Sequence, residues 1–272
     1  MTSPNLWNQL LVWPIVNLLV VFYKLFEWLH LPGPLGWAII LLTIAIRLLL
    51  YPLMQQQLKS AKKMAELKPH LDALSAKHKD DKGKLQQAQL ELYKQHGVNP
   101  AAGCLPLLIQ FPVLIALYNV FYQVLNNGNL EKMIGEINSI LYWSSLKLSS
   151  LDLTFFGINL GVKPGEWQKY GWWLLTVPLI TALLQWYQTK LMTPSLASSK
   201  FKIQNSKLEN QKENKEKIPE DTAAEMQKQM ALITPIMFGF FALQFPLGLS
   251  LYWNVFGIVG ILQQLRINTQ KS

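Results

Sequence analysis

Five long apolar runs constrain the fold of this chain more than any other feature of its sequence. A membrane-spanning helix needs about 20 mostly apolar residues. Half of the chain is hydrophobic and 15% is charged, whereas roughly a quarter of the residues in soluble domains are charged. We therefore predict an all-α membrane protein, a five-span helical bundle. The predicted spans are residues 36–55, 100–125, 170–192, 230–245 and 247–266.

The segment before the first span, residues 7–30, has two interpretations. Its polar side chains fall within about half of a helical wheel, which favours an N-terminal amphipathic helix lying in the membrane interface. Val16, Val20 and Tyr23 interrupt this stripe, so a sixth span is the alternative. The polar residues of the stripe are Asn8, Gln9, Asn17, Lys24, Glu27 and His30.

The distribution of lysine predicts the orientation of the spans. Residues 56–98 carry nine lysines against five acidic residues, and residues 190–230 carry eight against six. Residues 126–169 carry four of each. Because basic loops stay in the cytosol, the first two segments are predicted to be cytosolic and the third extracytoplasmic. Five spans then place the start of the chain outside and the tail, residues 267–272, in the cytosol.

The segments between the spans differ in pattern. In residues 56–98, apolar residues recur mostly at three- or four-residue steps on both sides of a polar break at 79–83. This pattern predicts a cytosolic helical hairpin, with a solvated basic loop as the alternative. Residues 193–229 read as a cytosolic linker with few apolar residues. The extracytoplasmic segment mixes turn residues with apolar ones, and we expect it to be compact but irregular.

The sequence carries no recognisable catalytic constellation. It contains no HExxH, GxSxG or Walker motif, and its four histidines lack metal-site spacing. A single cysteine, Cys104, rules out a disulfide framework. No Asp or Glu lies within the predicted spans, which excludes an aspartyl intramembrane protease and removes the usual carboxylate of proton-coupled transport. We expect no enzyme, no cofactor and no metal.

Arg47 is a charge deep inside the first predicted span. It lies about 12 Å of helix from the nearer end of that span, and a charge at such depth costs about 2.5–3.5 kcal/mol on insertion scales. Snorkelling toward the headgroups is one solution. The interpretation that we prefer is a water-containing cavity, open toward the cytosol, that keeps Arg47 hydrated.

Other polar residues of the spans are candidates to line such a cavity, although each alone is typical of a helix–helix hydrogen bond. Trp253, by the same default, is an aromatic packing residue. The candidate lining residues are Thr43, Gln110, Asn119, Thr181, Gln185, Gln188, Gln244, Ser250 and Asn254.

Three motifs point to one family. Residues 97–112 read Gly-Val-Asn-Pro-Ala-Ala-Gly-Cys-Leu-Pro-Leu-Leu-Ile-Gln-Phe-Pro, and residues 43–48 read Thr-Ile-Ala-Ile-Arg-Leu. Residues 245–254 read Phe-Pro-Leu-Gly-Leu-Ser-Leu-Tyr-Trp-Asn, with a Gln-Gln pair at 263–264. In this order they resemble the signature, the arginine-bearing first span and the final hairpin of the YidC family of membrane protein insertases. The likeness extends over residues 7–267, and the family has mitochondrial and chloroplast relatives.

The resemblance implies a site. Its expected form is a hydrophilic groove inside the bundle, open to the cytosol and to lipid and closed toward the outside. Arg47 matches the charge of this groove, Gln188 a polar position on the third span and Trp253 an aromatic position on the fifth. The substrate-binding residues that we expect are Arg47, Gln188, Trp253, Thr43, Gln110, Gln185 and Asn254.

The resemblance also implies a function. Family members capture hydrophilic tails of nascent membrane proteins and release the apolar segments into the bilayer of the bacterial inner membrane. The expected partners are nascent membrane proteins and the lipid bilayer, with the ribosome, a targeting receptor and the Sec translocon as further candidates. No specific nucleic-acid site is expected. A transporter for a small anion bound at Arg47 lacks a coupling acid, and a passive assembly scaffold does not explain a costly buried charge.

The predicted orientation can be tested at the two ends of the chain. In a Cys104→Ser background, a cysteine introduced at Asn5 should react with an impermeant thiol reagent added to intact cells. A cysteine at Gln270 should react only after lysis, because the tail is predicted to be cytosolic. Labelling of the Asn5 position only after lysis would contradict this topology.

Overall fold

Helices make up most of the protein in a computed structural model that describes residues 2–78, 81–97, 111–119, 130–192 and 222–269. Within these residues, one pair of short strands is the only sheet. Residues 111–119, in the predicted second span, are helical. The rest of that span, including Gln110, lies outside the described residues, as do residues 193–221 of the predicted linker.

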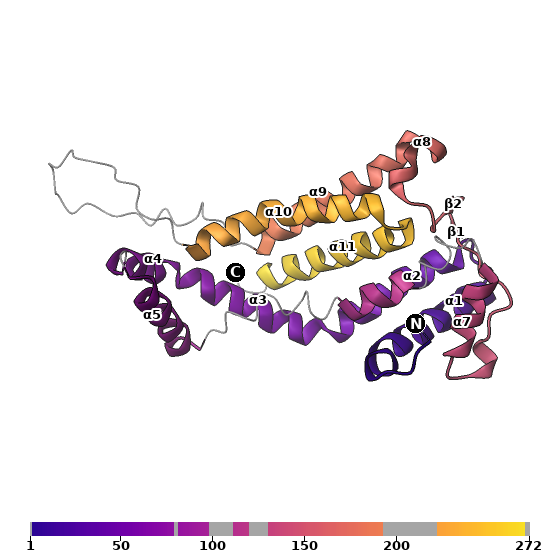
Figure 1. The fold of residues 1–272 in the computed structure, drawn as a ribbon, viewed down its shortest axis with the longest axis horizontal. Helices are drawn as coiled ribbons and strands as arrows, with labels where there is room; N and C mark the ends of the chain where they lie inside the picture. Colours follow the sequence, from indigo (N-terminus) through magenta and orange to yellow (C-terminus); the bar gives the residue numbers. More distant parts are fainter. Residues whose placement is uncertain (1, 79–80, 98–110, 120–129, 193–221, 270–272) are drawn as a thin grey trace.

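Five helices lie side by side in a row, with their axes roughly along the length of the molecule (Figure 1). In this row α1 packs on α2, α2 on α11, α11 on α9, and α9 on α10. Their bounds are α1 Trp13–Trp28, α2 Pro34–Leu49, α9 Thr176–Met192, α10 Thr222–Gln244 and α11 Leu247–Thr269. Helix α11 therefore lies between α2 and α9 and contacts both.

Small residues and hydrogen bonds bring these helices close together. A Cβ at Gly239 of α10 would come within 3.1 Å of the Ala182 Cβ on α9. The Thr181 hydroxyl of α9 donates a hydrogen bond to Asn254 Oδ1 of α11 at 2.8 Å. Such contacts hold helices together in a bilayer, because lipid is itself apolar and the hydrophobic effect does not favour helix–helix contact there. Residues 111–119 join the same core through Val113, Ala116 and Leu117.

At one end of the bundle, residues 130–166, here called the cap segment, fold over the helix ends (Figure 1). The sequence predicts a compact but irregular segment, and the structure adds short regular elements to it. These are helix α7 Leu130–Ser139, the antiparallel strands β1 Thr154–Phe155 and β2 Ile158–Asn159, and the 3₁₀ turns Ser144–Leu146 and Pro164–Glu166.

The cap segment is attached to α2 through an aromatic ring. Gly33 precedes α2 with φ 70°, a conformation that favours glycine, and a Cβ there would come within 2.8 Å of the Phe155 ring. Gly36, one turn on, also lies against this ring. The ring then meets Trp37 edge-on, with 5.5 Å between centroids. Glycine at both positions thus lets Phe155 lie directly on the first turn of α2.

The cap segment also satisfies the first turn of α11. The backbone N–H of Leu247 donates to the Val162 carbonyl at 2.9 Å, and the N–H of Gly248 donates to the Leu160 carbonyl at 2.8 Å. The first N–H groups of a helix have no partner within the helix. Here the cap segment provides two of these partners, and it therefore holds the start of α11.

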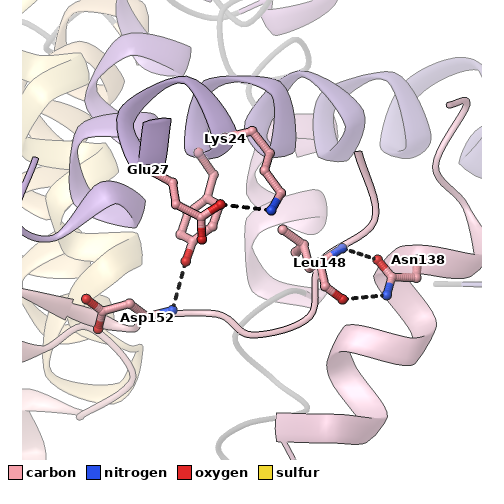
Figure 2. A network of polar contacts seen from close by, with 6 residues as sticks. Lys24, Glu27, Asn138, Leu148 and Asp152 are labelled. Atoms are coloured by element: carbon pink, nitrogen blue, oxygen red, sulfur yellow. Dashed lines mark hydrogen bonds and ion pairs between the residues drawn. The ribbon is translucent and has the colours of Figure 1, made fainter. Parts of the chain in front are cut away.

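Helix α1 holds the cap segment from the other side. Asn17 donates to the Ile140 carbonyl at 2.9 Å and accepts from the Tyr142 N–H at 2.8 Å. The Tyr23 hydroxyl accepts from the Asp152 N–H at 3.0 Å. Figure 2 shows this region, with Asn138 bonded to both backbone groups of Leu148 and with Lys24 paired to Glu27 at 2.8 Å.

Three helices extend from the opposite end of the bundle: α3 Tyr51–Glu66, α4 Lys68–Lys77 and α5 Lys82–Gln95. The predicted hairpin has two helices, and the structure has a further break at Leu67 because Pro69, in the first turn of α4, cannot continue the hydrogen bonds of α3. Helices α4 and α5 pack on one another through Leu67, Leu71, Leu92 and Tyr93. Asp81 caps α5 by accepting from the Lys84 N–H at 3.0 Å, which lowers the pKa of Asp81.

Three helix boundaries differ from the predicted spans. In residues 36–55, α2 ends at Leu49 and α3 begins at Tyr51, because Pro52 cannot continue the hydrogen bonds of α2. In residues 170–192, Gly171 at φ 112° separates α8 Trp167–Tyr170 from a 3₁₀ turn, Trp172–Leu175, and α9 follows. In residues 230–245, α10 begins already at Thr222, since residues 222–229 are polar but include good helix formers.

The segment 7–30 forms a π-helical turn, Asn8–Val12, followed by α1. Its polar residues do not form one exposed stripe, because Asn8 and Asn17 are buried and hydrogen-bonded. The three residues that interrupt the stripe, Val16, Val20 and Tyr23, belong to the buried face. The stripe therefore reflects, in part, attachment to the rest of the fold.

Helix length and composition limit which segments can cross a membrane. Among the described residues, the stretch Asn8–Trp28 alone is long and apolar enough to cross, and Pro34–Leu49 and Leu232–Gln244 are apolar but shorter. The interfacial position of residues 7–30 and the count of five spans stay predictions.

The attachment of the cap segment to α1 predicts a local loss of stability. Asn17→Leu leaves the Ile140 carbonyl and the Tyr142 N–H without this partner, and should lower the free energy of unfolding by about 1–3 kcal/mol. Thermal unfolding in detergent measures the loss, and protease cleavage between residues 140 and 152 locates it. Gln9→Leu, at an exposed position near the start of the same helical stretch, is the control. An Asn17→Leu chain as stable and protected as the wild type would contradict this role.

Candidate functional site

Arg47 lies in the last turn of α2 and faces α11. Its side chain is only 3% exposed. A positive charge near a helix C-terminus is favoured by the helix dipole. Burial nevertheless removes the charge from water, so its remaining partners must come from neighbouring helices.

Phe256 of α11 provides two of the contacts to the guanidinium. Arg47 Nη2 donates a hydrogen bond to the Phe256 carbonyl at 2.7 Å. The Arg47 Cζ lies 3.4 Å from the centroid of the Phe256 ring. A cation over an aromatic face gains about 2 kcal/mol or more when it is desolvated. One residue of α11 thus stabilises the charge with both its backbone and its side chain.

Gln263, two turns further along α11, faces the same arginine. Arg47 Nη1 donates to Gln263 Oε1 and Gln263 Nε2 donates to the Arg47 carbonyl, both at 3.4 Å. These are long, weak hydrogen bonds. The Nε of Arg47 is buried without a hydrogen-bond partner, and among the residues that the structure describes no carboxylate pairs with the guanidinium. One N–H of this buried cation thus has no hydrogen-bond partner among the described residues.

Gln188 of α9 reaches the same place from the other side of α11. A Cβ at Gly260 would collide with Arg47 Nη2 and lie 2.7 Å from Gln188 Nε2. The guanidinium and the amide thus meet over one glycine of α11. The structure therefore brings Arg47 and Gln188, two of the expected substrate-binding residues, together.

Three other expected residues, Thr43, Asn254 and Gln185, lie apart from this contact. Thr43 is fully buried and donates to the Ile39 carbonyl at 2.6 Å within its own helix. Asn254 accepts from Thr181, as described above. Gln185 lies about one turn before Gln188 and is half-buried. Gln110 lies outside the described residues.

Trp253 is surrounded by aromatic rings from α10 and the turn that follows it. The ring centroids of Phe238, Phe241 and Phe245 lie 5.4, 6.4 and 5.8 Å from it. The indole is 6% exposed. Trp253 therefore joins α10 to α11 by aromatic packing, and its expected role toward a substrate stays a prediction.

A family model described as 60Kd inner membrane protein matches residues 27–272 of this chain. The chain belongs to the 60Kd inner membrane protein family. The match confirms the resemblance to the YidC family, because members named YidC are among the most similar curated proteins. One is the membrane protein insertase YidC of Helicobacter pylori strain J99, 32% identical over 237 residues, which cover 87% of this chain and 33% of that protein.

Further members of the 60Kd inner membrane protein family align over most of this chain. YidC of Pelobacter propionicus is 32% identical over 262 residues, covering 96% of this chain and 39% of that protein. The chloroplastic inner membrane ALBINO3-like protein 1 of Chlamydomonas reinhardtii is 33% identical over 233 residues, which cover 83% of this chain and 42% of that protein. The chain thus spans about a third to two fifths of the length of these curated relatives.

A solved structure supports the fold of this family member. The crystal structure titled as an active YidC insertase with its first transmembrane domain resolved aligns with a TM-score of 0.55 at 25% identity. The alignment covers 95% of this chain and 46% of that one. The helical bundle with its cap segment is therefore a YidC-type fold.

The partners of Arg47 in this YidC-type fold differ from the hydrated cavity that the sequence suggests. The guanidinium is buried against α11 instead of facing water, because Phe256 and Gln263 supply the contacts that water would otherwise provide. Sequence reasoning missed Phe256, Gly260 and Gln263 as residues that contact Arg47. Their spacing of four and three residues places them on one helix face. This spacing is the feature of the sequence that could have indicated a shared contact.

Proposed function

We propose that this chain is a membrane protein insertase and chaperone of the bacterial inner membrane. It captures the hydrophilic tail of a nascent membrane protein at Arg47 and Gln188. It then releases the adjacent apolar segment sideways into lipid. Burial of that segment drives the release, at about 25 cal/mol per Å² of apolar surface.

The observation that carries this proposal is a buried cation with no acidic partner in the described residues. Keeping a charge at such depth costs about 2.5–3.5 kcal/mol on insertion scales. A structural arginine would be expected to have a carboxylate, since an unpaired buried charge is costly. Within the described part of the chain, Arg47 instead retains an N–H without a partner, which suits a site that takes up anionic groups such as the carboxylates of an acidic tail.

Large exposed apolar faces support a position within the bilayer. Contiguous exposed apolar side chains mark interaction surfaces, and α9 and α10 each expose several large apolar residues. Lipid is the partner that we assign to these faces. Their exposed residues are Leu179, Ile180, Leu183 and Trp186 on α9, and Leu232, Ile233, Ile236, Met237 and Phe240 on α10.

Exposed aromatic side chains near the cap segment support the same placement. Tryptophan and tyrosine gather where the membrane meets water, and here they lie around the end of the bundle that we assign to the outer face. Lys190, toward the other end of α9, has its Nζ 5.1 Å from the Trp186 ring. The exposed aromatic residues near the cap are Trp28, Tyr142, Trp143, Phe156 and Trp172.

The difference between the two ends of the bundle supports entry of the tail from the cytosolic side only. Hydrogen bonds and aromatic packing join the cap segment to α1, α2 and α11. A groove inside this bundle would therefore be closed at the cap and open to the cytosol at the other end. We place the start of the chain outside, residues 7–30 at the outer interface and the tail in the cytosol.

Helices α4 and α5 lie at the end where the tail would enter. Residues 56–98 carry a net positive charge, which suits acidic proteins, anionic headgroups or ribosomal RNA. We propose that this hairpin receives the emerging chain. The ribosome, a targeting receptor and the Sec translocon are proposed partners on the same reasoning.

The charge of Arg47 should decide which tails are inserted. In vesicles that contain only this chain, Arg47→Ala should reduce insertion of a single-span protein with an acidic tail roughly tenfold or more. The physical reason is that opposite charges 4 Å apart attract by about 4 kcal/mol at an effective dielectric constant of 20. Arg47→Lys should retain much of the activity, and a matched neutral tail should be much less affected. The measurement is the protected fraction of each tail against time.

Two controls make this experiment specific. Arg266→Ala removes the other arginine of the chain, exposed near the end of α11, and should leave the ratio between acidic and neutral tails unchanged. Flux of chloride or phosphate through the same vesicles tests the alternative of an anion transporter. Equal loss of both tails in Arg47→Ala, or anion flux that depends on Arg47, would contradict the proposal.

A further inference from the structure

The contact between α2, α9 and α11 centres on a residue that has no side chain. A Cβ added at Gly260 would collide with Arg47 Nη2, and it would lie 2.7 Å from Gln188 Nε2 and 2.9 Å from Arg47 Cζ. In protein structures, Cβ atoms essentially never lie within 3.0 Å of heavy atoms outside their own part of the chain. The guanidinium and the amide therefore occupy the space that any other residue at this position would fill.

Gly257, nearly one turn earlier on α11, differs in this respect. A Cβ there would lie 3.7 Å from Gln188 Oε1 and 3.8 Å from the Leu184 Cβ, which are ordinary van der Waals distances. Alanine fits at residue 257 and does not fit at residue 260. The need for glycine is thus confined to the position that faces Arg47.

We infer that Gly260 is a positioning residue for Arg47, a role that rests on the proposed function of Arg47 as the receptor for acidic tails. The missing Cβ leaves a notch on α11, here called the Gly260 notch. In this notch the guanidinium reaches the Phe256 carbonyl and lies over the Phe256 ring. The Gly260 notch thereby keeps the cation out of water and beside Gln188.

The Gly260 notch also defines what a substrate must offer. A ligand has to replace a backbone carbonyl and an aromatic face, both of which stabilise a cation without carrying a full charge. A carboxylate does so and can also accept from the unpaired Nε of Arg47. A neutral amide or hydroxyl gains little by the exchange. The notch therefore favours tails with Asp or Glu over neutral polar tails.

Alanine at position 260 should move the arginine and leave the helix in place. The atoms in the way belong to the ends of two flexible side chains, which can shift at low cost compared with the backbone. The displaced guanidinium then loses a charged hydrogen bond and a cation–π contact. This loss lowers the fraction of molecules in which the guanidinium occupies the notch by roughly tenfold or more.

Arginine modification reports on this displacement without any substrate. The sequence has two arginines, buried Arg47 and exposed Arg266, and phenylglyoxal reacts with accessible guanidinium groups. In the detergent-solubilised full chain, Arg47 should be protected relative to Arg266 in the wild type and in Gly257→Ala. In Gly260→Ala, Arg47 should react about tenfold faster, following the loss of its two contacts. Equal protection in Gly260→Ala and wild type would overturn the inference.

A second measurement links the Gly260 notch to function. Gly260→Ala should reduce insertion of acidic tails more than neutral tails in vesicles, and Gly257→Ala should reduce neither. Adding Arg47→Lys to Gly260→Ala should restore acidic-tail insertion, because the compact ammonium does not need the space that the planar guanidinium fills. No restoration, or equal loss for both tails, would overturn the positioning role.

The two readouts separate this inference from the proposed function. Faster modification of Arg47 with unchanged insertion would uphold the Gly260 notch and contradict the receptor role of Arg47. If Gly260→Ala does not accumulate, accumulation of the double variant Gly260→Ala with Arg47→Lys would support a collision with the guanidinium. Failure of both variants to accumulate would overturn the inference, since glycine would then be required for packing alone.

Discussion

The contact between the Arg47 guanidinium and α11 is the interaction on which the rest of the structure depends. A charge buried in a bundle has to be stabilised by groups that are already fixed in place. Phe256 supplies a carbonyl at 2.7 Å and a ring at 3.4 Å, and Gly260 leaves the space for both. This arrangement explains why α11 lies between α2 and α9, because only a central helix can face the arginine and Gln188 together.

The cap segment gives this bundle two different ends. It satisfies the first N–H groups of α11, packs Phe155 on the first turn of α2 and is held by Asn17 of α1. The start of α11 is thus fixed, while Gln263, which faces Arg47 of α2, lies toward the other end of α11. A bundle fixed at one end can open at the other without unfolding. The proposed capture of a tail from the cytosol needs such an asymmetry.

The sequence predicted most of the helices but not the contacts of the site. Apolar runs longer than 15 residues indicated α2, α9, α10 and α11, and local chain chemistry then shifted their ends, as at Pro52 and Gly171. Arg47 was identifiable because a charge inside an apolar run is costly. Its partners Phe256 and Gln263 lie more than 200 residues away, and no local pattern links them to Arg47. The polar residues of 7–30 illustrate the same limit, since Asn17 is buried by a loop that is distant in the sequence.

The central claim is that the space between Arg47 and Gln188 receives the hydrophilic tail of a membrane protein in transit. A photoreactive amino acid at position 188, in the otherwise complete chain, tests it most directly against a ribosome-stalled single-span substrate. Position 186 on the same helix is the matched control, because Trp186 is exposed on the face assigned to lipid. The account predicts adducts between position 188 and the acidic tail, and adducts at position 186 with lipid or with the apolar segment. Equal crosslinking of the tail from both positions, or none from position 188, would contradict it.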